Sequence, residues 1–381
     1  MGKETKGMYL FSDFAEVETE REYNGYFYSV RSAIIITICG MFCGLRNMKE
    51  IHMWATVEKM KEFFQERFGI EDIPCYSWFT QILGIIKPRS FSEIFTKWIM
   101  GLAGEMGDMT ISLDGKTVRS TTRMKGYETP LHIISAQLAE LGITIGQTAV
   151  EGKSNEIPAI QKLLDFLDIK GCMVVADALN CQKETALKVI EGGGDYLLSV
   201  KDNQPTLKAE IADYVQDTSL RASMDTITQT EKNRDRVETR IAYTTPDIDW
   251  LYGRGEWKNL ICIGAINTRF VTKKGETNEW RYYISSRKLT AAELLDRARK
   301  EWSVESMHWL LDVHLGEDNC RAHEQRTQEN LNIIRKVILN VLRLYKTASY
   351  SKAAFTHLML QCMFDPSNIL KFCSAAGRGA N

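Results

Sequence analysis

The hydrophobic positions of the first hundred or so residues repeat three and four apart, which is helical spacing. An apolar run begins at Val30 and ends at Gly44, and a second helical pattern runs from Met48 to Gly69. The predicted helices span residues 30–44, 48–68, 76–86 and 90–102. We therefore expect residues 1–105 to be all-helical, either as a small DNA-binding domain or as a helical cap on the region that follows.

From residue 109 the pattern changes to short apolar and β-branched runs. Strands are predicted over residues 109–113, 131–139, 143–150, 172–176 and 196–200. Helices are predicted between the later strands, with Asn155 and Asn180 as caps of the first two and Pro205 at the start of the third. Three strands followed by alternating helices and strands indicate an α/β fold of the ribonuclease H-like type, in which a mixed sheet has helices on both faces.

A β-rich insertion then interrupts this order. Its strands are predicted over residues 237–243, 260–265 and 281–284. Thr290 and Glu293 form a capping box that opens a long helix to about Val313, and a further helix is predicted over residues 330–345, with a helical tail to about Phe372. The predicted regions are a helical N-terminal domain (1–105), an α/β core (106–224 and 288–325), the insertion (225–287) and C-terminal helices (326–381).

Composition narrows the functional classes. The 381 residues carry a net charge of −1, so any binding of nucleic acid must depend on local basic patches. The longest apolar run, residues 33–43, is too short to cross a bilayer, and the N-terminus lacks the apolar segment of a signal peptide. The nine cysteines lack the paired spacing of a zinc site. These features predict a cytoplasmic protein with reduced cysteines and no membrane partner.

Three carboxylates occupy positions from which they could share one centre. Asp114 ends the first predicted strand, and Asp177 ends the fourth, which has the pattern of a buried parallel strand. Glu305 lies on the late helix between Trp302 and Trp309, on a face that we expect to point inward. Carboxylates without matching His or Cys suit Mg²⁺ or Mn²⁺, and two such ions about 4 Å apart can activate a nucleophile and stabilise a leaving oxygen.

The alternative interpretation is that these acids have only structural roles. Asp114 followed by Gly115 is also the commonest signal of a β-hairpin turn, and Asp177 could be a turn residue. Gly115, in the metal-binding interpretation, would let an ion or a phosphate approach the backbone. The ordered trio on this strand order favours the metal site.

Several ordered motifs resemble those of the DDE transposases of bacterial insertion sequences, in the ISAs-type branch that includes the H-repeat-associated proteins. The motifs are Asp114-Gly-Lys-Thr-Val-Arg119, Lys153-Ser-Asn-Glu-Ile-Pro158, Ala176-Asp-Ala-Leu-Asn-Cys-Gln-Lys183, Lys201-Asp-Asn-Gln-Pro205 and Trp302-Ser-Val-Glu-Ser-Met-His-Trp309. The resemblance covers nearly the whole chain, including the N-terminal helices. It implies Mg²⁺-dependent cleavage and joining of double-stranded DNA at transposon ends, with Asp114, Asp177 and Glu305 as catalytic metal ligands, and a dimer on DNA.

The last motif departs from the pattern of related transposases. Those proteins often place Tyr, Arg and Lys around the third acid, where this chain has Ala298, Glu301 and Asp312. The acidic Glu301 puts a local phosphate contact in doubt. Asp312 is a rival to Glu305 as third ligand, although the Trp-x-x-Glu pattern matches the family at Glu305.

Other polar residues are candidates for DNA contact. They are Lys116, Arg119, Lys153, Asn155, Lys201, Asn203 and Gln204, which flank the predicted acids or precede helices whose N-termini can hold phosphate. Lys232, Arg234, Arg236 and Arg240 could make the insertion a DNA-facing arm or a solvated hairpin. We expect His132 to be structural and His308 to be packed or hydrogen-bonded instead of binding metal.

Two other functions fit the same residues. One is a metal-dependent nuclease, or a domesticated relic, that cuts DNA without transposing. The other is a non-catalytic DNA-binding protein whose acids no longer hold metal, a possibility that the intact trio disfavours. Our prediction from the sequence is a DNA transposase that acts with two Mg²⁺ or Mn²⁺ ions at Asp114, Asp177 and Glu305.

Overall fold

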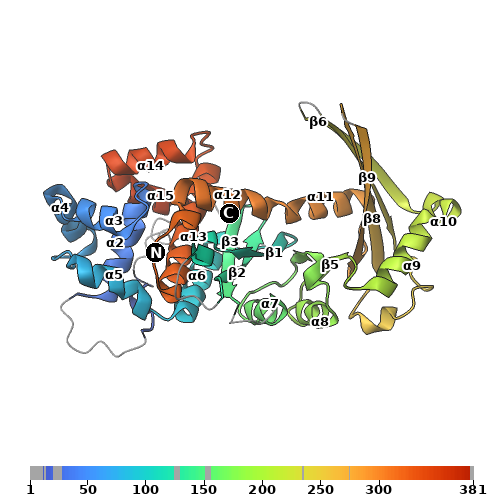
Figure 1. Ribbon diagram of the computed structural model, residues 1–381, viewed down its shortest axis with the longest axis horizontal. Helices are drawn as coiled ribbons and strands as arrows, with labels where there is room; N and C mark the ends of the chain where they lie inside the picture. The colour runs from blue at the N-terminus through green and yellow to red at the C-terminus, as the bar shows by residue number, and fades with distance from the viewer. Residues whose placement is uncertain are drawn as a thin grey trace.

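The structure is a computed structural model, which describes residues 12, 14–19, 28–123, 129–150, 156–233, 236–273 and 275–377. Its centre is one nine-stranded sheet in the order β3-β2-β1-β4-β5-β9-β8-β7-β6 (Figure 1). The strands are β1 (Thr110–Thr117), β2 (His132–Leu138), β3 (Ile143–Ala149), β4 (Met173–Ala176), β5 (Asp195–Val200), β6 (Asp225–Asn233), β7 (Arg236–Thr245), β8 (Cys262–Thr272) and β9 (Gly275–Ser285).

The sheet is mixed, as the strand pattern predicted. β1 pairs in parallel with β4, and β4 pairs in parallel with β5, whereas β2 and β3 are antiparallel to their neighbours. Short apolar strands such as β4 are buried along their whole length, which is typical of parallel strands covered on both faces. The ribonuclease H-like α/β prediction is confirmed.

The hairpin turn that was the alternative interpretation of Asp114 and Gly115 is absent. β1 continues to Thr117 and stays paired with β2 through both residues. Its parallel pairing with β4 ends one residue earlier, at Leu113 opposite Ala176. Asp114 and Gly115 therefore mark the point where β1 separates from β4. The turn preference of these two residues is outweighed by the pairing of β1 with β2.

The β-rich insertion extends the central sheet. β9 pairs antiparallel with β5, and β8, β7 and β6 follow by antiparallel pairing. Figure 1 shows these strands standing upright at one end of the molecule. β6 was missed from the sequence, because its alternating polar residues at the edge of the sheet carry little apolar signal.

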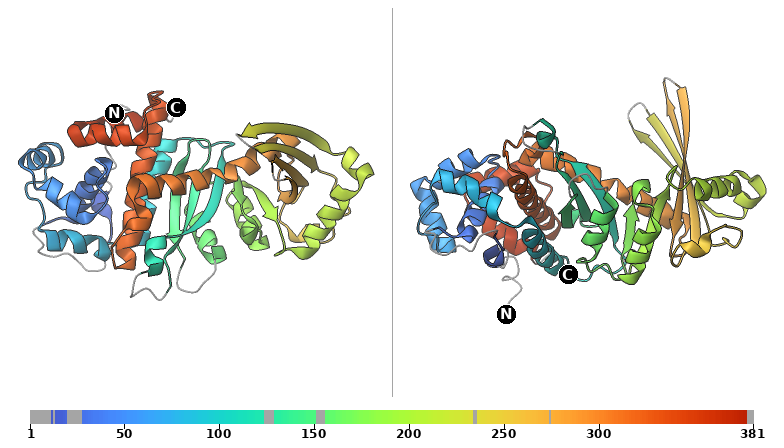
Figure 2. Two further views of the ribbon diagram at one scale, coloured as in Figure 1. Left: turned by 45° about the horizontal axis from the view of Figure 1, so that its top comes forward. Right: turned by 60° about the horizontal axis from the view of Figure 1, so that its bottom comes forward.

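Helices cover both faces of the sheet. On one side lie α7 (Glu156–Leu164) and α8 (Lys183–Glu191), and on the other α11 (Ala291–Glu301) and α12 (Ser303–Leu315) run one after the other (Figures 1 and 2). The predicted capping box at Thr290 is present. The single long helix that we expected is instead divided at Trp302, which caps both halves.

The remaining helices gather at the end of the sheet opposite the insertion (Figure 2). They are α2 (Val30–Phe42), α3 (Met48–Ala55), α4 (Glu58–Phe68), α5 (Tyr76–Ile85), α6 (Pro88–Ala103), α13 (Gln325–Ala348), α14 (Phe355–Phe364) and α15 (Ser367–Ala376). α9 (Pro205–Gln216) and α10 (Thr218–Ala222) lie at the insertion end. The pattern predicted one helix over 48–68, but the chain breaks at Thr56 and starts α4 after Val57.

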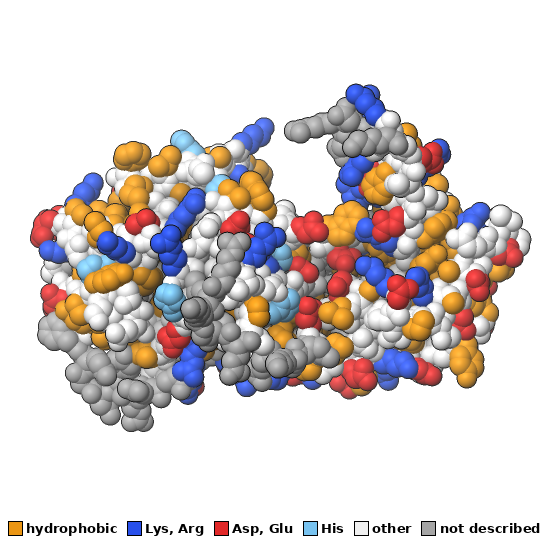
Figure 3. All heavy atoms as spheres, in the orientation of Figure 1, with side chains coloured by type: hydrophobic (Ala, Val, Ile, Leu, Met, Phe, Trp, Pro, Cys, Tyr) orange, Lys and Arg blue, Asp and Glu red, His pale blue; other side chains and the backbone are white. Residues whose placement is uncertain are grey.

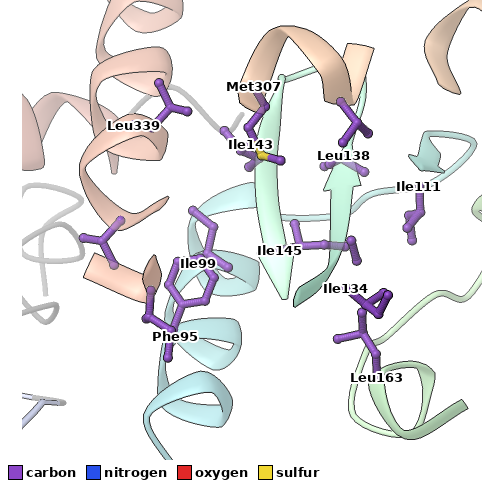
Figure 4. Close-up of a cluster of buried hydrophobic side chains, with 14 of the residues drawn as sticks. Phe95, Ile99, Ile111, Ile134, Leu138, Ile143, Ile145, Leu163, Met307 and Leu339 are labelled. Atoms are coloured by element: carbon purple, nitrogen blue, oxygen red, sulfur yellow. The ribbon is translucent and has the colours of Figure 1, made fainter. Parts of the chain in front are cut away.

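Helix α13 joins the terminal helices to the sheet. It packs on α2, α5, α6 and β3, so the N-terminal and C-terminal helices share one hydrophobic core with the sheet. The outer edge of β3 is completed by Asn340 of α13, whose amide accepts from the Thr144 backbone N–H at 2.9 Å and donates to its carbonyl at 2.7 Å. Figure 4 shows part of the core, where Phe95 and Ile99 of α6, Met307 of α12 and Leu339 of α13 lie near the strands.

Candidate active site

Asp114 faces the side of the sheet that α11 and α12 cover. Side chains alternate along a strand, so Ser112, Asp114 and Lys116 share that side. The Ser112 hydroxyl donates to the carbonyl of Lys300 at 3.1 Å, which holds the end of α11 over β1. The Asp114 side chain is 37% exposed. The sheet and the end of α11 therefore leave this carboxylate partly open to solvent.

Asp177 follows β4 directly and caps the short 3₁₀ helix Ala178–Asn180. Its Oδ1 accepts from the side-chain amide of Asn180 at 2.7 Å and from the backbone N–H of Asn180 at 3.3 Å. Because β1 and β4 are adjacent and parallel, with Leu113 opposite Ala176, Asp114 and Asp177 follow paired positions on neighbouring strands. Asp177 therefore lies at the end of a parallel strand, as predicted, and also caps a turn.

The helical acids come from the junction of α11 and α12. Glu301 is the last residue of α11 and is half-buried, whereas Glu305 lies in the exposed first turn of α12, where the helix dipole favours a negative charge. Asp312, the rival third acid, accepts instead from the backbone N–H of Asp318 at 3.3 Å. Asp312 therefore helps to hold the turn that follows α12.

Two carboxyl groups of this site, Asp114 and Glu301, have raised pKa values. Burial, with the negative charges of Asp177, Glu156 and Glu305, raises the pKa of Asp114 to about 6, against a backbone hydrogen bond from Gly115 that lowers it. Burial, Asp177 and Asp114 together raise the pKa of Glu301 to about 7, against the opposing charges of Arg281 and Lys201. Glu301 is thus a fourth acid of the group, which the sequence prediction had treated only as an obstacle to phosphate.

A divalent cation would neutralise this excess of negative charge. Carboxylate oxygens are ligands that suit Mg²⁺ or Mn²⁺. Its geometry is not that of a closed ligand cluster. Within the described parts of the chain, no three His, Cys, Asp or Glu side chains are grouped closely enough to hold a metal ion. Metal binding would have to draw these carboxylates together.

A second network supports Asp177 from the other side of the sheet. His132 Nε2 lies 2.9 Å from Glu156 Oε1, its Nδ1 lies 2.8 Å from the hydroxyl of Thr117, and Asn180 hydrogen-bonds to Glu156. The hydrogen bond and charge of His132 hold the pKa of Glu156 below its usual value. His132 is structural, as predicted.

The same pair explains Gly115. A Cβ at this position would come within 2.5 Å of His132 Nε2 and 2.9 Å of Glu156 Oε1. We had interpreted this glycine as room for an ion or phosphate at the backbone. Its missing side chain instead makes room for the imidazole and the carboxylate that lie over β1.

The tryptophans beside Glu305 do not point inward, contrary to our prediction. Trp302 is 39% and Trp309 is 59% exposed. The guanidinium of Arg281, on β9, lies 4.5 Å from the centre of the Trp302 ring, so the insertion contacts the junction of the two helices. The buried face of α12 is formed by Val304, Met307, Leu311 and Leu315. The helical period was correct, but the amphipathic face was assigned to the wrong side, because large aromatic residues were taken as core.

The residues predicted to contact DNA have different surroundings. Lys116 pairs with Glu317, Arg119 is exposed with its Nε 3.8 Å from Asp318, and Lys201 is exposed. The Asn203 amide donates to Ala178 O at 2.5 Å, and the Gln204 amide donates to Cys181 O at 3.0 Å. The last two residues thus hold the loop after Asp177. Lys153 and Asn155, with the helix cap predicted at Asn155, lie outside the described residues.

The basic residues of the insertion are largely paired. Arg240 is buried between Glu231 and Glu238, and Arg236 contacts Glu238 at 3.1 Å. Arg299 of α11 also binds Glu231, at 2.6 Å. These ion pairs favour the hairpin interpretation for Arg236 and Arg240; Arg234 lies outside the described residues.

Asn180 does not cap α8, as we had predicted. It lies in the 3₁₀ turn and binds Asp177 and Glu156, while Gln182 precedes α8. Glu156 lies in one of the quoted family motifs but was not among the predicted site residues. Its signal, a carboxylate in the first turn of a helix, is common on solvated helices, and only the tertiary structure places it beneath the strand that carries Asp114.

Two family models match this chain. The model described as "Transposase DDE domain" covers residues 106–341, and the model described as "DDE_Tnp_1-associated" covers residues 11–99. The chain belongs to the DDE transposase family and is a DNA transposase by class.

Named relatives agree with this family. The chain is 32% identical to the H repeat-associated putative transposase YhhI of Escherichia coli K12 over 320 residues, which are 81% of this chain and 83% of that one. It is 31% identical to the putative transposase YncI of E. coli O157:H7, covering 81% of each chain. A piggyBac transposase synaptic complex with hairpin DNA matches 96% of this chain and 80% of its own at 10% identity, with a TM-score of 0.46. No helix among the described residues is long and apolar enough to cross a membrane.

Proposed function

We propose that this transposase cleaves the phosphodiester bonds at the ends of its element and joins the freed 3′ ends to target DNA, with Asp114, Asp177 and Glu305 as the metal-binding acids. The observation that carries the proposal is the group of carboxylates around the ends of adjacent parallel strands, where burial and the negative charges of Asp177, Glu156 and Glu305 raise the pKa of Asp114 to about 6. Structural carboxylates are normally paired with cations, and uncompensated ones mark functional sites.

Mg²⁺ or Mn²⁺, two ions in the DDE scheme, would supply activation of the attacking water or 3′ hydroxyl and stabilisation of the leaving oxygen. The protein's own part is positioning. Asn180 orients Asp177, β2 pairing holds Asp114 at the strand separation, and the α11–α12 junction presents Glu305. We include Glu305 instead of Asp312, because Glu305 acts on the pKa of Asp114 whereas Asp312 is used in a turn.

DNA would lie across this partly open carboxylate group. Lys201 and Arg119 are exposed and are the cations that we propose for phosphate contact. Lys116, Asn203 and Gln204 would act on DNA through the loops that they hold, and Lys153 and Asn155 remain predictions from the sequence. We further propose action in the cytoplasm and a dimer on DNA, since two element ends must be held together for joining.

The test is a cleavage assay on linear DNA that carries the terminal sequences of the element, with Mg²⁺ or Mn²⁺. Asp114→Asn and Asp177→Asn should each abolish strand cleavage and lower Mn²⁺ affinity measured by calorimetry. Asp202→Asn is the matched control, because this exposed aspartate pairs with Lys208 at 2.7 Å and belongs to no carboxylate group. Full cleavage by either acid variant would refute the assignment, and cleavage without joining of paired ends would reduce the protein to a nuclease.

A further inference from the structure

A histidine that the proposed mechanism does not use contacts Asp114. His308 of α12 has its Nδ1 3.5 Å from Asp114 Oδ2, slightly beyond a normal hydrogen bond, and its side chain is 17% exposed. It lies one turn after Glu305, on a side of the helix that faces the sheet. The role of this contact depends on whether Nδ1 carries the proton, because only Nδ1–H can donate to the carboxylate.

His308 also lines a small cavity between β1, β2, α12 and α13. Lys116, Ser135, Glu317, Asn332 and Lys336 line it with His308. Lys336 is 2% exposed and donates to the hydroxyl of Ser135 at 2.7 Å. Glu317 is 1% exposed and accepts from both Lys116 and the Asn332 amide. A buried lysine at this place is unusual, since an ammonium group is costly to bury unless it is paired.

Hydrogen-bond donors are in excess in this cavity. When both lysines are protonated, their ammonium groups carry six N–H donors in all and no acceptor; for Lys336 this form holds below its pKa, which burial lowers to about 7. The Glu317 oxygens already receive bonds from Lys116 and Asn332. If Nε2 of His308 faces these donors, it is stabilised in the unprotonated form, in which its lone pair can accept a hydrogen bond. The imidazole proton then remains on the other nitrogen, Nδ1, which is the nitrogen next to Asp114.

We propose that Lys336 and Lys116 hold His308 in the Nδ1–H tautomer, so that His308 donates a hydrogen bond to Asp114 and positions its carboxylate. Lys336 is therefore a positioning residue that acts through His308. This inference uses the proposed function only where it names Asp114 as a metal ligand. Partners of this kind, one bond removed from the ligand, orient metal-binding side chains and commonly change metal affinity by about 10–100-fold when removed.

The first experiment needs neither metal nor DNA. The ¹⁵N chemical shifts of the histidine rings distinguish the two tautomers, and the signal of His308 among the six histidines is assigned by its loss in His308→Asn. The Nδ1–H tautomer is expected in the unsubstituted protein, with a shift toward Nε2–H in Lys336→Met. An Nε2–H tautomer in the unsubstituted protein, with its proton directed at the otherwise unpartnered Oδ1 of Asn332, would overturn the inference.

The second experiment measures Mn²⁺ affinity by calorimetry in a double-mutant cycle. Lys336→Met should weaken binding at least about tenfold, in the range given for such partners. His308→Asn supplies the second background of the cycle, because an asparagine amide offers an N–H near the position of Nδ1 that does not depend on Lys336. In the His308→Asn background, Lys336→Met should then have little further effect. An equal loss in both backgrounds would mean that Lys336 acts on folding and not through His308.

Lys346→Met is the control from the same helix. Its ammonium lies 4.9 Å from the Phe355 ring, about three turns along α13 from Lys336, and it should leave both readouts unchanged. If Lys336→Met fails to fold by circular dichroism, Lys336→Gln keeps an N–H donor without the charge and should retain the tautomer. Absence of Mn²⁺ binding in the unsubstituted protein would refute the proposed function, while the tautomer measurement would still decide this inference.

Discussion

Asp114→Asn should make the metal-free protein more stable while it removes activity. Burial, together with the negative charges of Asp177, Glu156 and Glu305, raises the pKa of this carboxylate from 3.8 to about 6. Asparagine has nearly the same shape and no charge. The substitution therefore removes the cost of burying a charge, and the repulsion from the neighbouring carboxylates, neither of which the unfolded chain experiences.

The magnitude follows from the pKa difference. A rise of roughly two pKa units corresponds to about 3 kcal/mol when Asp114 is fully ionised, because one unit is worth about 1.4 kcal/mol. The side chain is 37% exposed, so solvent screening reduces the expected gain to about 1–2 kcal/mol.

The sign of the pH dependence is fixed by the direction of the shift. A carboxylate with a raised pKa in the folded state binds more protons there than in the unfolded chain between about pH 4 and pH 6. The unsubstituted protein thus loses stability as the pH rises through this window. The advantage of Asp114→Asn should be complete above the folded pKa of about 6 and reduced to about half at pH 5.

The assay is denaturant unfolding in EDTA at pH 8 and pH 5, followed by circular dichroism. Asp202→Asn is the control, since hydrogen bonding and the charge of Lys208 lower the pKa of this exposed aspartate and its removal should give no gain. Saturating Mn²⁺ should reverse the order at pH 8, because only the unsubstituted protein gains stability from binding. A loss of stability in Asp114→Asn at pH 8, or a gain of equal size at both pH values, would refute the electrostatic argument.

Three further outcomes are expected. Gly115→Ala should lower the free energy of unfolding by about 1–3 kcal/mol, because its Cβ would collide with His132 and Glu156. Gly101→Ala, at an exposed position of α6 with open space around it, should raise the free energy of unfolding by about 0.5–1 kcal/mol. Equal effects of the two substitutions in denaturant titrations would contradict the steric account. Lys116→Met should lower stability by about 3–5 kcal/mol by leaving Glu317, 1% exposed, without its cation; a change below about 1 kcal/mol would show that the pair is solvated. Glu305→Gln should abolish cleavage of element-end DNA, and cleavage at the unsubstituted rate would remove it from the proposed set.

The helices, the strands and the class of protein could be predicted from the sequence. Helices and strands depend on local residue patterns, and the class depends on motifs that occur in a fixed order along the chain. Apolar runs of strand length and helical periodicity predicted the mixed sheet and most helices, and the ordered motifs around Asp114, Asp177 and Glu305 predicted the family. The capping box at Thr290 was also correct, because a cap depends only on residues within one turn.

Element boundaries and the environment of the site required the tertiary structure. The Asp-Gly turn is absent because pairing with β2 outweighs a turn preference, and the insertion joins the central sheet because β9 finds the open edge of β5. Trp302 and Trp309 lie on the exposed face, since apolar spacing gives the period of a helix but cannot say which face meets the sheet.

The sequence by itself thus determined the kinds of elements and their order along the chain, with Asp114 at the end of the first predicted strand and Asp177 at the end of the fourth, because these depend on short-range patterns of residues. Only the tertiary structure decided what surrounds them: Glu301 and Glu156 nearby, Asn180 on Asp177, and His308 with buried Lys336 behind Asp114. The physical reason is that pKa values and hydrogen-bond partners depend on residues that are distant in the chain and are brought together only by packing.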